Sequence, residues 1–90
     1  MRVLLAEDEK ALSKALVTIL ERNNYSVDAV YDGESALEYL ENDNYDIAIL
    51  DIMMPKIDGL TVLKNVRKRN NLIPILLFCL LYTSDAADEL

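Results

Sequence analysis

The chain has 90 residues, of which 52% are hydrophobic and 28% are charged. With only two glycines and two prolines, this composition is that of one folded domain and excludes a disordered or fibrous chain. The net charge of -7 argues against binding of this segment to a nucleic-acid backbone, because that binding requires clustered positive charge.

Short apolar segments alternate along the chain with segments of helical periodicity. A continuous apolar run of four to eight residues indicates a buried strand, and an i, i+4, i+7, i+8 apolar spacing indicates an amphipathic helix. In chain order, the predicted elements are a strand at 2–6, a helix at 9–22, a strand at 25–30, a helix at 33–42, a strand at 45–50, a helix at 60–69 and a strand at 75–81. The helical residues expected to face inward are Leu12, Leu16, Ile19, Leu20, Ala36, Leu37, Leu40, Leu63 and Val66.

Regular alternation of strand and helix predicts an α/β fold with a doubly wound parallel sheet, covered on both faces by crossover helices. The most apolar stretch, residues 72–82, has 11 residues and contains Pro74, whereas a membrane-spanning helix needs about 20. The start of the chain lacks a signal-peptide pattern, and the single cysteine cannot form an intramolecular disulfide. We therefore expect a cytoplasmic domain that does not contact a membrane.

Acidic residues follow two of the predicted strands, at the edge where parallel sheets bind ligands. Glu7 and Asp8 end the first strand, and Asp51 ends the third. Because neighbouring strands lie about 4.8 Å apart, these carboxylates would crowd one small volume and raise one another's pKa values unless a cation compensates. Mg²⁺ prefers such oxygen ligands. The pattern predicts a Mg²⁺ site in which Asp51 keeps an oxygen free to act as a nucleophile.

A second interpretation assigns the first two acids to helix capping. Glu7 and Asp8 directly precede a predicted helix, where acidic side chains satisfy free N–H groups and complement the helix dipole. Asp51 fits this interpretation less well, because it precedes the sequence Ile-Met-Met-Pro, which is not a helix start.

Three sequence segments carry a resemblance to a known family. They are VLLAEDE at 3–9, YDGESALEYL at 31–40 and DIAILDIMMPKIDGLTVLKNVRK at 46–68. Over residues 1–77 the chain closely resembles the receiver domain of bacterial two-component response regulators, and specifically the N-terminal part of a winged-helix regulator of the OmpR class. The resemblance implies a flavodoxin-like receiver fold and a sensor histidine kinase as partner.

The resemblance also assigns roles to individual residues. Asp51 would be the phosphoacceptor, receiving a phosphoryl group from a phosphohistidine of the kinase. Asp8 and Asp51 would ligate Mg²⁺ directly, Glu7 would act through water, and the main-chain carbonyl of Met53 would complete the protein ligands. Two further residues, Pro55 and Gly59, would shape the loop that follows the acceptor.

Other positions depart from the family pattern. The family has a Thr or Ser at the end of its fourth strand, and here that switch position falls on Cys79, or on Thr83 in a longer strand. A thiol is a weak hydrogen-bond donor. A lysine that ends the fifth strand of the family has no counterpart in these 90 residues. We expect a partial receiver domain at 1–78, truncated after the fourth strand, and an atypical tail at 79–90 that is not native family sequence.

Four functions remain open on these grounds. A phosphoacceptor receiver would be a signalling module and not an enzyme; it would reach DNA only through an absent C-terminal domain, and its full-length relatives dimerise on phosphorylation. A non-switching fragment would bind metal or kinase only. An aspartyl phosphatase would need a second acid where Met53 stands. A flavin-binding protein would need a loop rich in hydroxyl groups and glycine after the first strand, where this chain has Glu7 and Asp8.

Overall fold

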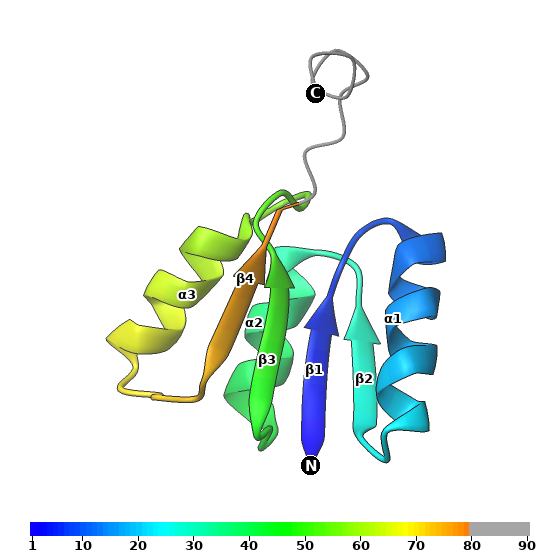
Figure 1. Ribbon diagram of the computed structural model, residues 1–90. Helices are drawn as coiled ribbons and strands as arrows, with labels where there is room; N and C mark the ends of the chain where they lie inside the picture. Colours follow the sequence, from blue (N-terminus) through cyan, green and yellow to red (C-terminus); the bar gives the residue numbers. More distant parts are fainter. Residues whose placement is uncertain (80–90) are drawn as a thin grey trace, which may run out of the picture.

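The computed structural model describes residues 1–79 of the chain. Strands and helices alternate throughout these residues (Figure 1). The elements are β1 (Arg2–Ala6), α1 (Lys10–Arg22), β2 (Ser26–Val30), α2 (Gly33–Asn42), β3 (Ile47–Asp51), α3 (Gly59–Lys68) and β4 (Ile75–Phe78). Residues 80–90 of the expected tail, with the alternative switch residue Thr83, lie outside the described residues.

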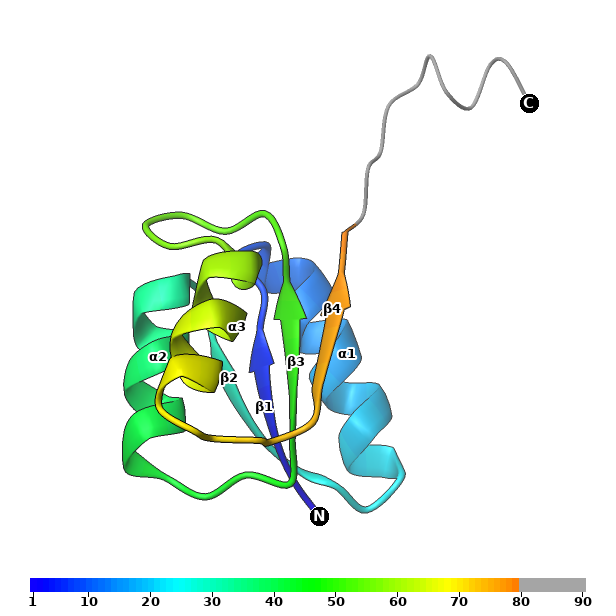
Figure 2. The ribbon, with the colours of Figure 1, turned by 90° about the vertical axis from the view of Figure 1, so that its left-hand side faces the viewer.

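All strand pairs in the described sheet are parallel, in the order β2-β1-β3-β4. Helices α2 and α3 cover one face of the sheet, and α1 lies against the other (Figures 1 and 2). This arrangement confirms the predicted α/β fold with a doubly wound parallel sheet. None of the helices within residues 1–79 is long and apolar enough to span a bilayer.

The central strands are buried on both faces, which explains their continuous apolar runs. In β1, Leu4 and Ala6 pack into the main core with helices α2 and α3. The alternate residues Val3 and Leu5 point to the other face, and they are only 1% and 0% exposed. The main core is completed by residues of α2, β3 and α3, among them Ala36, Leu40, Ala48, Leu50, Val62 and Val66.

The inward face of α1 differs from the prediction. Ile19 was expected inward but is 55% exposed, whereas Ser13 is 1% exposed. Seen down the helix axis, the half-buried Leu20 lies close to Ser13, and Ile19 lies about a third of a turn away from both. The stripe that meets the sheet is therefore centred on a small polar residue, which a search for apolar spacing does not select.

The bounds of several elements differ from the prediction by one to three residues. Strand β3 begins at Ile47, helix α3 begins at Gly59, and β4 ends at Phe78. Aspartate caps explain two of the helix starts: Asp32 Oδ1 accepts the N–H of Ser35 at 2.7 Å, and Asp58 Oδ1 accepts the N–H of Thr61 at 2.7 Å. Each cap satisfies an N–H group that has no partner within its own helix.

Candidate functional site

Three carboxylates meet at the carboxyl edge of the sheet. Strands β1 and β3 are adjacent, with Ala6 opposite Leu50, so the residues that follow lie side by side. One oxygen from each of Glu7, Asp8 and Asp51 lies within 4.8 Å of the others. Glu7 is 2% exposed and Asp51 is 8% exposed, whereas Asp8 is exposed. The structure thus brings together the three acids on which the predicted metal site depends.

Burial of Glu7 makes its charge unfavourable. Burial raises the pKa of Glu7 to about 7, with further raising contributions from Asp8 and Asp51, although the N–H of Glu9 lowers it. Glu7 Oε2 accepts that N–H at 2.8 Å. Carboxyl groups this close together repel one another when all are ionised, and a cation bound between them offsets that repulsion. Their oxygen atoms are the ligands that Mg²⁺ prefers. This donor set fits a Mg²⁺ ion.

The helix-capping interpretation describes one contact of these acids. Glu9, the N-cap residue of α1, makes no side-chain cap hydrogen bond. Glu7 Oε2 accepts the N–H of Glu9, the N-cap residue, so Glu7 satisfies one N–H group at the start of the helix.

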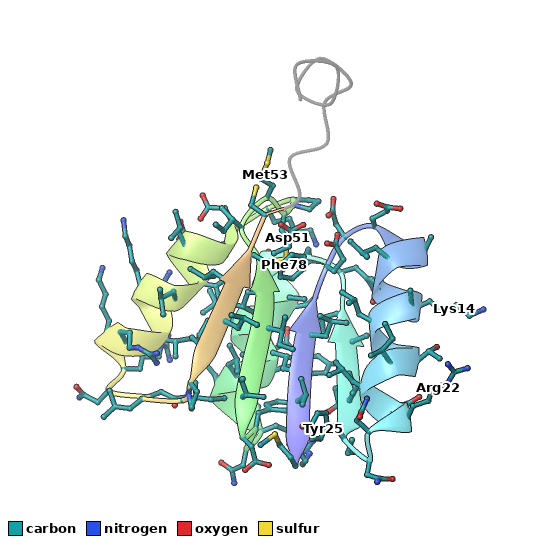
Figure 3. The ribbon with its side chains drawn as sticks, viewed as in Figure 1. Lys14, Arg22, Tyr25, Asp51, Met53 and Phe78 are labelled. Carbon is teal, nitrogen blue, oxygen red and sulfur yellow. The ribbon has the colours of Figure 1, made fainter. Side chains whose placement is uncertain are left out.

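The loop after β3 orients the Asp51 carboxylate. The N–H of Met53 donates to Asp51 Oδ1 at 3.1 Å, and the Met53 side chain is 60% exposed. Figure 3 shows Asp51 beside Phe78 at one end of the sheet, with Met53 directed away from it. An open hollow of about 470 Å³ lies next to these residues, and it is lined by Asp8, Ile52, Met53, Met54, Pro55 and Asp58.

Gly59 closes this loop against the acceptor strand. Its N–H donates to the carbonyl of Ile52 at 2.9 Å. A Cβ atom at Gly59 would lie 2.4 Å from the carbonyl oxygen of Asp51, so a larger residue would push the loop away from Asp51. The reason for glycine here is the close approach of two backbones, and its φ is not positive.

Pro55 begins a strained turn in the same loop. Its carbonyl accepts the N–H of Ile57 at 2.8 Å, across Lys56, whose φ is 69°. A positive φ within a three-residue hydrogen-bonded turn is the geometry of a classic γ-turn, which is rare and strained. The residue types in this loop do not predict the turn, because lysine, which stands at position 56, does not favour positive φ.

Cys79 lies at the same edge of the sheet. Phe78, the residue before it, pairs with Asp51 in the β3–β4 register, and the Phe78 carbonyl accepts the N–H of Ile52 at 2.8 Å. The Cys79 side chain is free and exposed. Cys79 directly follows Phe78, the last residue of β4.

A family model and curated relatives show which protein family this chain resembles. Residues 3–89 match the family model of the response regulator receiver domain. The transcriptional regulatory protein DltR of Streptococcus agalactiae is 46% identical over 76 residues, which are 84% of this chain and 34% of DltR. The transcriptional regulatory protein TctD of Salmonella typhimurium is 46% identical over 77 residues, which are 86% of this chain and 34% of TctD. The chain thus spans about a third of the length of these curated relatives.

Solved structures show the same likeness. The receiver domain of the Francisella response regulator 1452 superposes with a TM-score of 0.86 at 33% identity, covering 98% of this chain and 73% of that one. The response regulator TrrA of Thermotoga maritima, solved in complex with Mg²⁺ and BeF, gives a TM-score of 0.84 at 36% identity, covering 97% of this chain and 75% of TrrA. With its fold, its acidic cluster and its sequence in agreement, the chain belongs to the response regulator receiver domain family.

Proposed function

We propose that this domain is the phosphoacceptor module of a two-component phosphorelay, with Asp51 as the acceptor and a sensor histidine kinase as the donor. The observation that carries the proposal is the meeting of three carboxylate oxygens within 4.8 Å at the carboxyl edge of the sheet. Membership of the receiver family supports the same assignment. The domain would act as a signalling module and not as an enzyme on an external substrate.

The proposed metal ligands are oxygen atoms of the same edge. Asp8 and Asp51 would bind Mg²⁺ directly, Glu7 would act through water, and the carbonyl of Met53 would complete the protein ligands. When bound, the metal offsets the negative charge of the transferring group. The bound cation would also reduce the repulsion among the three carboxylates and so offset the cost of burying a charged Glu7.

The transfer itself would take place at an oxygen of Asp51. That oxygen would form a bond to phosphorus while the phosphorus–nitrogen bond of the phosphohistidine breaks. The electron pair of the broken bond would stay on the imidazole nitrogen. Asp51 is suited to this step because Met53 holds one of its oxygens by a hydrogen bond of 3.1 Å, which fixes the direction of the carboxylate.

The output of the domain would lie in a separate part of the protein. By resemblance to the OmpR class, we propose that a C-terminal domain binds DNA and that phosphorylation promotes dimerisation in the cytoplasm. The names of DltR and TctD as transcriptional regulatory proteins support this proposal. Cys79 would hold the switch position, where its thiol would bind a phosphoryl oxygen more weakly than a hydroxyl.

The test is phosphorylation by a small acyl phosphate, followed by intact mass. We expect the wild type to gain one phosphoryl group with Mg²⁺ and none in the presence of a chelator. Asp51→Asn should abolish the gain. Asp58→Asn is the matched control, because Asp58 lines the same hollow and asparagine can replace it as a helix cap. A folded wild type that gains no mass, or an Asp51→Asn variant that gains as much, would contradict the proposal.

A further inference from the structure

The N-terminus of α2 touches the loop that carries the proposed metal ligand Met53. We name residues 52–58 the acceptor loop. Gly33, the first residue of α2, donates its N–H to the carbonyl of Pro55 at 3.4 Å. Asp32 Oδ2 lies 3.8 Å from Lys56 Nζ. Two segments separated by about twenty residues of sequence thus meet at the loop that follows Asp51.

The contact at Gly33 leaves no space for a side chain. A Cβ atom on Gly33 would lie 1.8 Å from the carbonyl oxygen of Ile57 and 2.6 Å from its carbonyl carbon. Real Cβ atoms essentially never approach closer than 3.0 Å. Since both of these atoms belong to the backbone, any larger residue would force the helix and the loop apart by more than an ångström.

The acceptor loop needs such support because its conformation is strained. Lys56, at its tip, has a φ of 69° within the γ-turn closed by the N–H of Ile57. Strained backbone of this kind persists only where the surrounding structure holds it in place. The helix α2 supplies contacts on both sides of the turn, at Pro55 and at Ile57.

The other end of the loop is fixed to the acceptor itself. The N–H of Met53 donates to Asp51 Oδ1 at 3.1 Å, and Gly59 packs against the Asp51 carbonyl. The acceptor loop is short and is attached to Asp51 near both of its ends. A displacement of Ile57 would therefore also shift Met53 and Asp51.

We propose that Gly33 and Asp32 are positioning residues, and that the N-terminus of α2 braces the acceptor loop so that the Met53 carbonyl and the Asp51 carboxylate keep the geometry needed for metal binding and phosphoryl transfer. The effect on metal binding rests on the proposed function. We call the contacts of Asp32 and Gly33 with the acceptor loop the brace. These contacts form without metal, so they are tested separately from metal binding.

The principal variant is Gly33→Ala, and the matched control is Leu40→Ala. Leu40 is 4% exposed in the same helix, at the end away from the loop, so its truncation destabilises α2 without touching the acceptor loop. The first readout is hydrogen exchange of the Ile57 and Gly59 amides in metal-free protein, measured by NMR. The second is Mg²⁺ affinity from the chemical shift of the Met53 amide during a titration.

Gly33→Ala should accelerate exchange at both amides and weaken Mg²⁺ binding, each by about 10-fold or more, since a displacement of about an ångström has effects of this order. Leu40→Ala should change the Mg²⁺ affinity by less than about 2-fold, because local contacts of the loop are retained. Equal effects of the two variants would overturn the brace, since they would show only a general loss of stability. Unchanged exchange in Gly33→Ala would also overturn it.

A second pair of variants leaves Gly33 unchanged. It tests whether α2 supports the acceptor loop even if Gly33→Ala does not fold. Lys56→Glu places a like charge opposite Asp32 and should accelerate exchange of the Ile57 amide by about 3-fold, the size expected for a partly exposed pair. Lys14→Glu makes the same change of charge at an exposed position of α1, on the other face of the sheet (Figure 1), and should leave that amide unchanged. Equal exchange in the two variants would contradict the brace. A wild type that does not bind Mg²⁺ would overturn the proposed function, and exchange alone would then decide the brace.

Discussion

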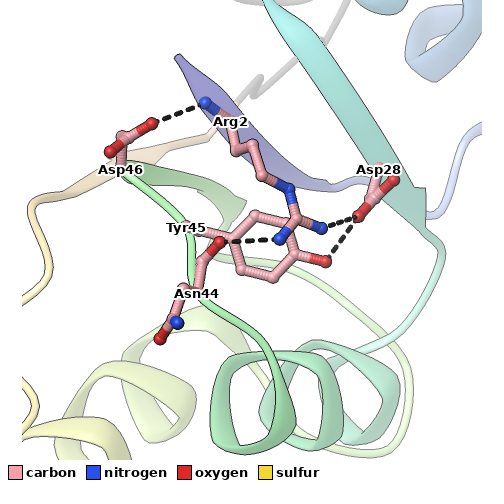
Figure 4. A network of polar contacts seen from close by, with 5 residues as sticks. All are labelled: Arg2, Asp28, Asn44, Tyr45 and Asp46. Atoms are coloured by element: carbon pink, nitrogen blue, oxygen red, sulfur yellow. Dashed lines mark hydrogen bonds and ion pairs between the residues drawn. The ribbon is translucent and has the colours of Figure 1, made fainter.

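Arg2 joins three segments at the end of the sheet opposite the acidic site (Figure 4). Its guanidinium lies 4.7 Å from the centre of the Tyr45 ring, within reach of a cation–π contact. The same group bonds Asp28 Oδ2 at 3.0 Å and the carbonyl of Asn44 at 2.9 Å, and the main-chain N–H of Arg2 donates to Asp46 at 2.6 Å. These contacts tie β1 to β2 and to the segment that precedes β3.

Tyr45 completes this network and makes it sensitive to alkaline pH. Its hydroxyl donates to Asp28 Oδ2 at 2.7 Å. Burial, together with the hydrogen bond to Asp28 and the charge of Asp28, raises the pKa of Tyr45 above its ordinary value. The proton is therefore held more tightly in the folded state than in the unfolded chain.

This raised pKa predicts a loss of stability at high pH. Below about pH 10 the phenol keeps its proton in both states, so the contribution of Tyr45 is present in full. As the pH rises above that value, the unfolded chain loses the proton first and unfolding becomes more favourable. In urea denaturation, Tyr45→Phe should lower the free energy of unfolding by about 1 kcal/mol at pH 7 and reduce its decline above pH 10.

The control for this prediction is Tyr39→Phe, because Tyr39 is 40% exposed. It should leave both the stability at pH 7 and its alkaline decline close to those of the wild type. An alkaline decline that is equally steep in Tyr45→Phe and in the wild type would show that Tyr45 does not contribute to it.

At the scale of the elements, strand β4 is covered less well than the central strand β3. Leu50 of β3 lies in the core beneath α2 and α3 and is 0% exposed. Leu76 of β4 alternates with Ile75 and Leu77, which pack against that core, so it points to the opposite face, and it is 55% exposed.

The same truncation should therefore have very different effects at these two positions. Leu50→Ala should lower the free energy of unfolding by about 3 kcal/mol, since it leaves a cavity in close-packed surroundings. Leu76→Ala should change it by no more than about 0.5 kcal/mol. Urea denaturation of both variants measures the difference, and similar losses would show that Leu50 and Leu76 are equally buried.

The order and type of the elements could be predicted because they depend on local patterns. The apolar run that contains Leu50 and the helical spacing of Ala36 and Leu40 each reside in a few neighbouring residues. The direction that α1 faces depends instead on how the helix lies on the sheet, and apolar spacing selected Ile19 where the structure buries Ser13. The caps at Asp32 and Asp58 had a local signal, an aspartate followed by glycine at a helix start, that the prediction did not use.

At the scale of the whole molecule, strand order determines the site. The parallel sheet places β1 beside β3, so Glu7 and Asp8 meet Asp51 across more than forty residues of sequence. This meeting was predictable, because acids followed both strands and parallel strands end at a common edge. The contact of Gly33 with Ile57 was not predictable, since it depends on the path of a loop that no residue pattern specifies.

The central claim is that Asp51 carries the phosphoryl group, and its most direct test is to locate that group in the chain. After treatment with a small acyl phosphate and Mg²⁺, borohydride reduction converts an aspartyl phosphate to homoserine, which marks the modified position. Peptide sequencing by mass spectrometry should then find homoserine at position 51 and aspartate at position 8. Homoserine at Asp8 or elsewhere, with Asp51 unchanged, would contradict the assignment of the acceptor.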